Sequence, residues 1–260
     1  MNAKISRSSG PPDAPSRRNP PSVPVEQLAF PDPLDLSFEG WQPEAFEMLE
    51  RLREEPHIGQ YRIERDNGRL GRYMKEPFKH YRNDLVVNFV LPNRLDFETE
   101  KNVFSRLLKN DFGAGGCHHH KWMAFYRPGA RRLTDVQITH GLHPDGFRVG
   151  LFVGGYGRDL LRQALKRMAA EPERFLSLLN PLFQNKNWTF RYARGSGKGE
   201  EQRAHEEPLE DIPDEVKKAR AIWIRHRFPR VQVVEQGAMF VQSALEAVRT
   251  VWPIYRFYLA

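Results

Sequence analysis

The densest group of chemically reactive residues in the chain combines one thiol with several imidazoles. The group consists of Cys117, His118, His119, His120, His140 and His143. Imidazole and thiolate are ligands for zinc and similar metals, and a histidine beside a cysteine could act as the base for a nucleophilic thiolate. However, the chain has neither a Cys-x-x-Cys nor a His-Glu-x-x-His motif, and a polar loop beside a small buried thiol explains the same residues. We therefore assign no metal ligand and no catalytic residue, and the sequence specifies no cofactor.

Arginines form a second group with a recognisable chemistry. Arg158 and Arg162 are four residues apart in a predicted helix, so they share one helix face. Guanidinium groups bind phosphates through paired hydrogen bonds, and the glycine-rich segment 154–157 before this helix could hold a phosphate at the helix N-terminus. The alternative is an ordinary solvated helix face. Arg127 and Arg148 fall on predicted strands nearby.

A polar stripe on one predicted strand completes the candidate site. Asp135, Gln137 and Thr139 alternate with apolar residues, so they lie on one face of the strand. They line either a polar cleft or the wet side of a half-covered sheet. The candidate ligand-binding residues are Arg127, Asp135, Gln137, His140, Arg148, Arg158 and Arg162.

The elements that must position these residues are strands in the middle of the chain and helices on both sides of it. Strands are predicted over 122–127, 134–140, 147–153 and 187–192, and the short turns between the first three indicate an antiparallel meander. Helices are predicted over 42–52, 71–86, 97–108, 159–170, 171–179, 216–227 and 235–255. The predicted fold is α+β: a small antiparallel sheet packed by helices from both ends of the chain.

Composition divides the chain into a tail and one domain. Residues 1–33 hold eight of the twenty prolines, which predicts a disordered N-terminal tail because proline removes backbone donors and little there can be buried. Residues 34–260 are predicted to form a single α+β domain. Within it, residues 194–215 are predicted to be a mobile polar loop because they are rich in Gly, Glu, Lys and Pro.

Charge and composition also limit the classes of partner that this protein can have. The net charge is +7 and the sequence pI is about 9.6, so the chain should attract polyanions, including nucleic acid. No apolar run reaches the roughly 20 residues of a membrane helix, which argues against a membrane partner. A single cysteine excludes an intrachain disulfide and favours a cytoplasmic location. The oligomeric state is not indicated.

Several short motifs resemble a known family. They are Phe38-Glu39-Gly40-Trp41, Glu76-Pro77-Phe78, Pro144-Asp145-Gly146-Phe147-Arg148-Val149-Gly150, Glu171-Pro172-Glu173-Arg174-Phe175 and Trp252-Pro253-Ile254-Tyr255. Together they resemble the bacterial family catalogued as domain of unknown function twenty-four sixty-one, over about Leu36 to the C-terminus. The resemblance implies a fold class but no reaction. The chain departs from the family pattern at 113–121, where a Gly- and His-rich segment replaces a charged one.

The sequence thus leads to one preferred function and two alternatives. The preferred hypothesis is non-catalytic binding of a phosphate-bearing or polyanionic partner through a basic sheet face. The first alternative is a hydrolase or nuclease-like enzyme that uses polar and histidine residues of the central sheet. The second is a protein-interaction module.

Overall fold

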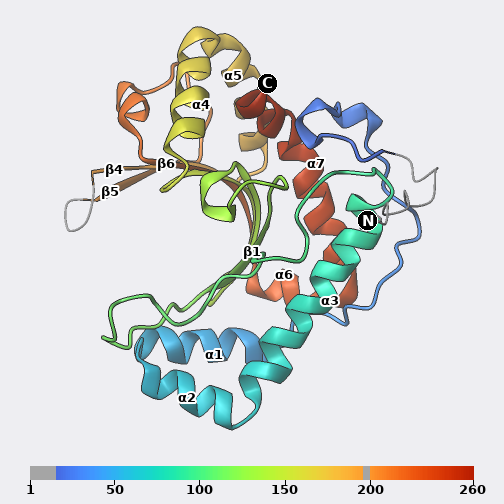
Figure 1. The fold of residues 1–260 in the computed structure, drawn as a ribbon, viewed down its shortest axis with the longest axis vertical. Helices are drawn as coiled ribbons and strands as arrows, with labels where there is room; N and C mark the ends of the chain where they lie inside the picture. The colour runs from blue at the N-terminus through green and yellow to red at the C-terminus, as the bar shows by residue number, and fades with distance from the viewer. Residues whose placement is uncertain (1–15, 196–199) are drawn as a thin grey trace, which may run out of the picture.

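A six-stranded antiparallel sheet organises the computed structural model, which describes residues 16–195 and 200–260. The strand order is β1-β2-β3-β6-β4-β5. The strands are β1 (Lys121–Phe125), β2 (Gln137–His143), β3 (Gly146–Gly154), β4 (Trp188–Arg194), β5 (Glu201–His205) and β6 (Ala221–Pro229). Helices from both ends of the chain pack around this sheet (Figure 1). The predicted α+β class is therefore confirmed.

Seven α-helices surround the sheet in the described ranges. They are α1 (Pro43–Glu54), α2 (Ile58–Asp66), α3 (Glu76–Leu85), α4 (Arg158–Ala170), α5 (Pro172–Leu179), α6 (Arg230–Glu235) and α7 (Phe240–Leu259). Pro77 occupies the second position of α3, directly after the π-helical turn Gly71–Lys75. None of the helices in the described part of the chain is long and apolar enough to cross a membrane.

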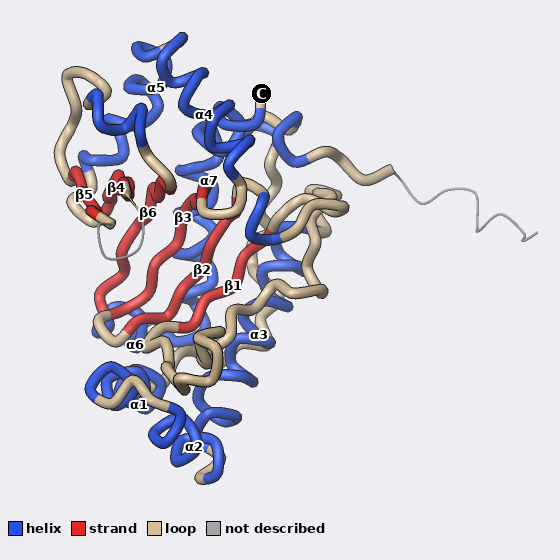
Figure 2. The backbone as a smooth tube through the Cα atoms, turned by 60° about the vertical axis from the view of Figure 1, so that its left-hand side comes forward, coloured by secondary structure: helices blue, strands red, loops and turns tan. Residues whose placement is uncertain are grey.

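The two faces of the sheet differ in what covers them. Helix α7 packs against β3 and lies behind the sheet in Figure 2, whereas no α-helix of the described residues crosses the face toward the viewer. Along β3, Val149 and Leu151 point into the core and are fully buried, while Arg148 and Phe152, which flank them, are only partly buried. This alternation follows from the two-residue period of a strand. The uncovered face is therefore the surface on which a site can form.

An aromatic cluster fixes the helices to the covered face. Trp41 contacts Phe78 of α3 with ring centroids 4.6 Å apart. Phe147 of β3 lies 5.4 Å from Tyr81 of α3 and 5.0 Å from Phe240 of α7. Edge-to-face and tilted aromatic pairs of this kind add to the free energy of burying their large apolar surfaces. The cluster thus joins segments that lie up to about 200 residues apart in the chain.

The predicted boundary of the disordered tail at residue 33 is wrong for the residues that the structure describes. The carbonyl oxygen of Val23 accepts a hydrogen bond of 2.8 Å from Trp252 Nε1, and that of Pro21 accepts one of 3.0 Å from Arg256 Nε. Val23 is fully buried against α7. Burial of the Val23 side chain helps to hold this segment in place, because α7 already provides an apolar surface for it. Residues 1–15 of the predicted tail lie outside the described part of the chain.

Two predicted helices and one predicted loop differ from the structure. Residues 97–108 form an extended segment that pairs at isolated positions with β1, such as Phe104 with Met123. The predicted helix over 216–227 is instead a short 3-10 turn (Asp214–Lys218) followed by β6. The predicted polar loop 194–215 contains the edge strand β5, whose mostly exposed residues carry no apolar alternation.

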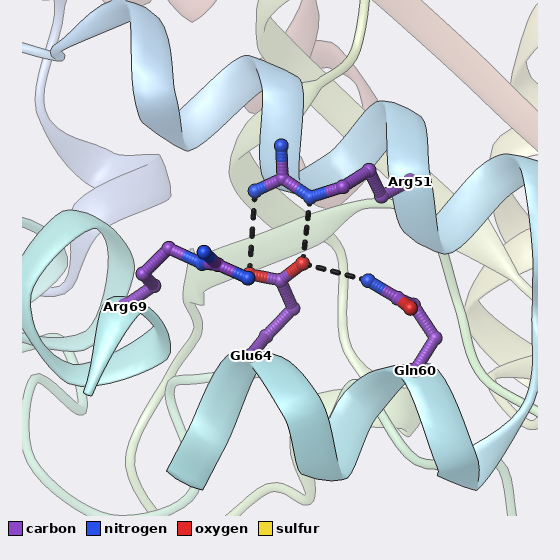
Figure 3. Close-up of polar contacts among 4 residues, drawn as sticks. All are labelled: Arg51, Gln60, Glu64 and Arg69. Carbon is purple, nitrogen blue, oxygen red and sulfur yellow. Dashed lines mark hydrogen bonds and ion pairs between the residues drawn. The ribbon is translucent and has the colours of Figure 1, made fainter. Parts of the chain in front are cut away.

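A buried carboxylate connects α1 and α2 with the turn that leads to α3 (Figure 3). Glu64 is fully buried, and its carboxylate accepts hydrogen bonds of 2.7 Å from Arg51 Nε, Arg69 Nε and Gln60 Nε2. Burial by itself raises the pKa of Glu64, but the hydrogen bonds and charges of Arg51 and Arg69 outweigh it and hold the pKa below its usual value. Glu64 therefore stabilises this corner only while it is ionised.

Replacing Val23 should show that the segment before residue 33 is part of the domain. Val23→Ala removes two buried methyl groups and should lower the free energy of unfolding by about 1–3 kcal/mol. The matched control is Val231→Ala on α6, because Val231 is 65% exposed, and it should change stability by less than about 0.5 kcal/mol. Chemical denaturation of both variants measures the difference. Equal stabilities would mean that the segment does not dock in solution.

Replacing Glu64 should give a pH-dependent loss of stability. Glu64→Gln keeps the shape of the side chain but removes the charge that pairs with both arginines. The free energy of unfolding at pH 7 should fall by about 1–3 kcal/mol. The loss is no larger because both arginines are partly exposed, so water can solvate their charges. Since the folded pKa lies below the unfolded value of about 4.3, the contribution is present above that value. It disappears as the pH falls through the folded pKa.

The matched control for Glu64 is Asp66→Asn on the same helix, because Asp66 forms an exposed ion pair of 2.7 Å with Arg65. Exposed pairs contribute little, so this variant should unfold like the wild type. Urea unfolding at pH 7 and at pH 3 compares the three proteins. If Glu64→Gln and Asp66→Asn behave alike at pH 7, the buried network does not stabilise the corner.

Candidate functional site

A cavity of about 380 Å³ opens on the uncovered face of the sheet, which is within the size range of small-molecule sites. Its lining combines three arginines, two histidines and three large aromatic rings. They are Arg148, Arg191, Arg225, His120, His143, Trp122, Phe152 and Trp223. These side chains come from β1, β3, β4 and β6 and from the ends of β1 and β2, so only the assembled sheet brings them together.

Small residues form the centre of this face. Thr139 of β2 pairs with Gly150 of β3, which pairs with Arg225 of β6. A Cβ atom at Gly150 would lie 2.0 Å from the carbonyl oxygen of Ile224 and 2.8 Å from the Cα of Arg225. Because neither backbone atom can move away cheaply, position 150 requires glycine. The missing side chain also leaves the space between Arg148 and Phe152 open.

The arginines of the cavity carry more positive charge than nearby carboxylates neutralise. Asp145 pairs with Arg148 at 2.9 Å and with Arg227 at 3.1 Å, whereas no carboxylate of the described residues forms an ion pair with Arg225. Burial, followed by the charges of Arg148 and Arg191, lowers the pKa of Arg225 to about 9. Arg225 remains protonated at pH 7. Keeping its guanidinium charged in this environment costs free energy, and a bound anion would offset that cost.

Two neutral histidines stand at one end of the cavity. The rings of His120 and His143 stack with centroids 5.1 Å apart and an interplanar angle of 16°. Burial, reinforced by neighbouring histidines and by Arg225 and Arg148, lowers the pKa of His120 to about 4. Burial and the charge of Arg148 also hold the pKa of His143 well below its usual value. At pH 7 each ring therefore offers one donor and one acceptor nitrogen.

An amide without a partner lies at the other end. Gln137 is fully buried, and neither its Oε1 nor its Nε2 makes a hydrogen bond to any described residue. Gln137 is opposite Phe152, and Phe152 is opposite Trp223, across β2, β3 and β6. Buried polar groups are nearly always hydrogen-bonded in folded proteins. An unpartnered amide in a cavity wall therefore points to a ligand.

A second basic pocket adjoins the cavity. The two share Phe152, Trp223 and Gln202 in their walls. Arg158 and Arg162, which the helix spacing singled out, line this second pocket. Arg162 forms an exposed ion pair of 3.1 Å with Asp159. The basic surface therefore continues from the cavity toward the start of α4.

The structure brings together only some of the predicted site residues. Gln137 and Arg148 line the cavity, and Arg158 and Arg162 line the adjoining pocket. The prediction that His140 shares their face is wrong, because its place in the β2 alternation turns it to the covered face. There it is fully buried and shares a hydrogen bond of 2.9 Å with the Tyr81 hydroxyl. Burial lowers the pKa of His140 to about 3, so the ring is a neutral core residue.

Asp135 and Arg127 likewise do not reach the cavity. The fully buried carboxylate of Asp135 accepts a hydrogen bond of 2.6 Å from Arg127 Nη2 and one of 2.7 Å from the Arg127 backbone N–H. Asp135 precedes β2, which begins at Gln137, so the predicted polar stripe does not extend back to it. The pair connects β1 to the start of β2 and has a structural role.

Several lining residues escaped the sequence analysis. Trp223 and Arg225 were missed because 216–227 was interpreted as a helix. The alternation that is typical of a strand was nevertheless present. Ile222 and Ile224 are buried, whereas Trp223 and Arg225, which alternate with them, face the cavity. Arg191 was missed because nothing local indicates that β4 pairs with β6.

The thiol and imidazole group does not converge on one point. In the described ranges no three His, Cys, Asp or Glu side chains are close enough to hold a metal ion. His140 and His120 lie on opposite faces of the sheet, as described above. Cys117 is buried, and burial raises the pKa of its thiol, which makes it a poor nucleophile.

Comparison with known proteins adds no relative. No protein-family model matches the chain, and no curated protein is significantly similar to it. The resemblance to the family of unknown function therefore stays a prediction.

Adding one methyl group at the centre of the sheet should test how the cavity is built. Gly150→Ala places a Cβ against the backbone of β6, so the protein should lose about 2 kcal/mol or more of unfolding free energy. The matched control is Gly71→Ala, where a Cβ would meet no atom within 4 Å. It should be neutral or stabilising by up to about 1 kcal/mol. A Gly150→Ala protein as stable as the control would refute the close approach of β3 and β6.

Proposed function

We propose that this protein binds a phosphate-bearing ligand in the cavity on the uncovered face of the sheet, without catalysing a reaction on it. The observation that carries this proposal is Arg225, a half-buried guanidinium with no carboxylate partner among the described residues, beside Arg148 and Arg191. Folding has placed like charges together at a cost in free energy. An anion bound between them would offset that cost.

The chemistry of the lining favours phosphate over other anions. A guanidinium group donates two parallel hydrogen bonds to the oxygens of one phosphate. His120 and His143 are neutral at pH 7 and add uncharged donors at the end of the cavity. The adjoining pocket with Arg158 and Arg162 would interact with further negative charge on a longer polyanion, including nucleic acid.

The shape of the site favours a small anionic group over a protein partner. Protein interfaces are mostly flat and extensive, whereas this site is a cavity of about 380 Å³ with a buried polar wall. A hydrolase could use His120 and His143 as acid and base. However, the two rings stack on each other, so they do not flank a bound group from opposite sides. Binding is therefore the function that the geometry supports best.

Neutralising Arg225 should weaken anion binding without unfolding the protein. Arg225→Gln removes a charge-assisted contact, so the affinity for inorganic pyrophosphate should fall by about 10- to 100-fold. The variant should be at least as stable as the wild type, because the repulsion from Arg148 and Arg191 is relieved. Isothermal titration calorimetry at constant salt measures the affinity.

The control for Arg225 is Arg62→Gln on α2, which removes an exposed arginine that does not line the cavity. It lowers the net charge equally and should leave the affinity nearly unchanged. If the two variants bind pyrophosphate equally well, general electrostatic attraction accounts for the binding. If the wild type does not bind pyrophosphate at low salt, the proposed function is wrong.

A further inference from the structure

We infer that the phosphate-bearing ligand of this cavity is a nucleotide, whose base is recognised by Gln137 and stacks on the aromatic wall beside it. This inference rests on the proposed function, because the arginines would bind the phosphate of the same molecule.

Gln137 specifies the kind of group that its end of the cavity accepts. Its side chain is fully buried and lines the cavity, with both the amide oxygen and the amide nitrogen unpartnered among the described residues. The complement of a carboxamide is a planar group with a donor and an acceptor on neighbouring atoms. The edges of nucleobases have this arrangement, and glutamine pairs with adenine through two such hydrogen bonds. A bare phosphate or a sugar phosphate would leave the amide unsatisfied.

Aromatic rings next to Gln137 supply a surface for the base. Phe152 and Trp223 follow Gln137 in register across the sheet, with their ring centroids 5.2 Å apart. Across the cavity, Trp122 carries the Arg132 guanidinium 4.5 Å from its ring centroid. Nucleobases stack on aromatic rings and on guanidinium planes of this kind.

The spacing between the amide and the arginines suits one nucleotide. Arg225 follows Trp223 by two residues along β6, and Arg148 precedes Phe152 by four residues along β3. At a rise of about 3.4 Å per residue, their Cα atoms lie about 7 and 14 Å from the aromatic row. The Arg148 guanidinium pairs with Asp145 at the far end of the cavity, and Gly150, which lies between Arg148 and Phe152 along β3, has no side chain to fill the space between them. A base in the aromatic row therefore places its phosphate, one sugar away, toward Arg225 and Arg148, while Arg191 lies opposite Trp223 in the row itself.

Calorimetry with two probes separates this inference from the proposed function. The probes are adenosine 5′-monophosphate and ribose 5-phosphate, which share the sugar and phosphate and differ in the base. Because stacking and paired hydrogen bonds add to affinity, the wild type should bind the nucleotide at least about 10-fold more tightly. Equal affinities would overturn the nucleotide inference and leave phosphate binding intact. If neither probe binds, the nucleotide inference and the proposed function both fail.

A variant of Gln137 tests the residue itself. Gln137→Met keeps the length of the side chain and removes an unpartnered buried amide, so the protein should fold at least as well as the wild type. Its affinity for the nucleotide should fall about 10-fold, while that for ribose 5-phosphate stays the same. Gln42→Met, at an exposed glutamine outside the cavity, is the control and should bind both probes like the wild type. A Gln137→Met protein that keeps its full preference for the nucleotide would refute recognition of the base by Gln137.

Discussion

The antiparallel pairing of β3 with β6 is the contact on which the rest of this structure depends. It is the central pair of the sheet, and it joins the hairpin in the middle of the chain to a strand about 75 residues further on. At Gly150 the two backbones approach so closely that a Cβ atom would lie 2.0 Å from a carbonyl oxygen. The same pairing places Arg225 beside the open floor of the cavity. Fold and candidate site therefore share one constraint.

The alternation of residues on these central strands produces two environments from one sheet. On the covered face, Phe147 and its aromatic neighbours pack against α3 and α7. On the uncovered face, β3 and β6 present arginines and aromatic rings to the cavity, and β2 adds the buried amide of Gln137. Rigid strands hold those side chains, and rigid elements position binding groups more accurately than loops do. The packed face thus stabilises the geometry of the polar one.

Two charged groups, the buried Glu64 and the half-buried Arg225, show how structural and ligand-binding electrostatics differ within one chain. Glu64 is surrounded by Arg51, Arg69 and Gln60, so its hydrogen-bonding capacity is used within the protein. Arg225 has arginines as its charged neighbours, and the unpartnered amide of Gln137 lines the same cavity. Satisfied networks stabilise a fold, whereas unsatisfied groups that converge on a cavity are typical of binding sites.

The sequence by itself determined the fold class, most helices and the β1-β2-β3 meander, because these depend on local periodicity and on short turns. It also identified Gln137 and Arg148 correctly as residues of one sheet face, since both lie on locally recognisable strands. It missed β5, β6 and the docked segment around Val23, whose positions depend on partners distant in the chain. The alternation along β2 already placed His140 on the face of Ile138, opposite to Gln137, but only the tertiary structure decided that Arg225 and Arg191 join Arg148. The reason is that strand pairing and register, which set those neighbours, are long-range properties that no local pattern encodes.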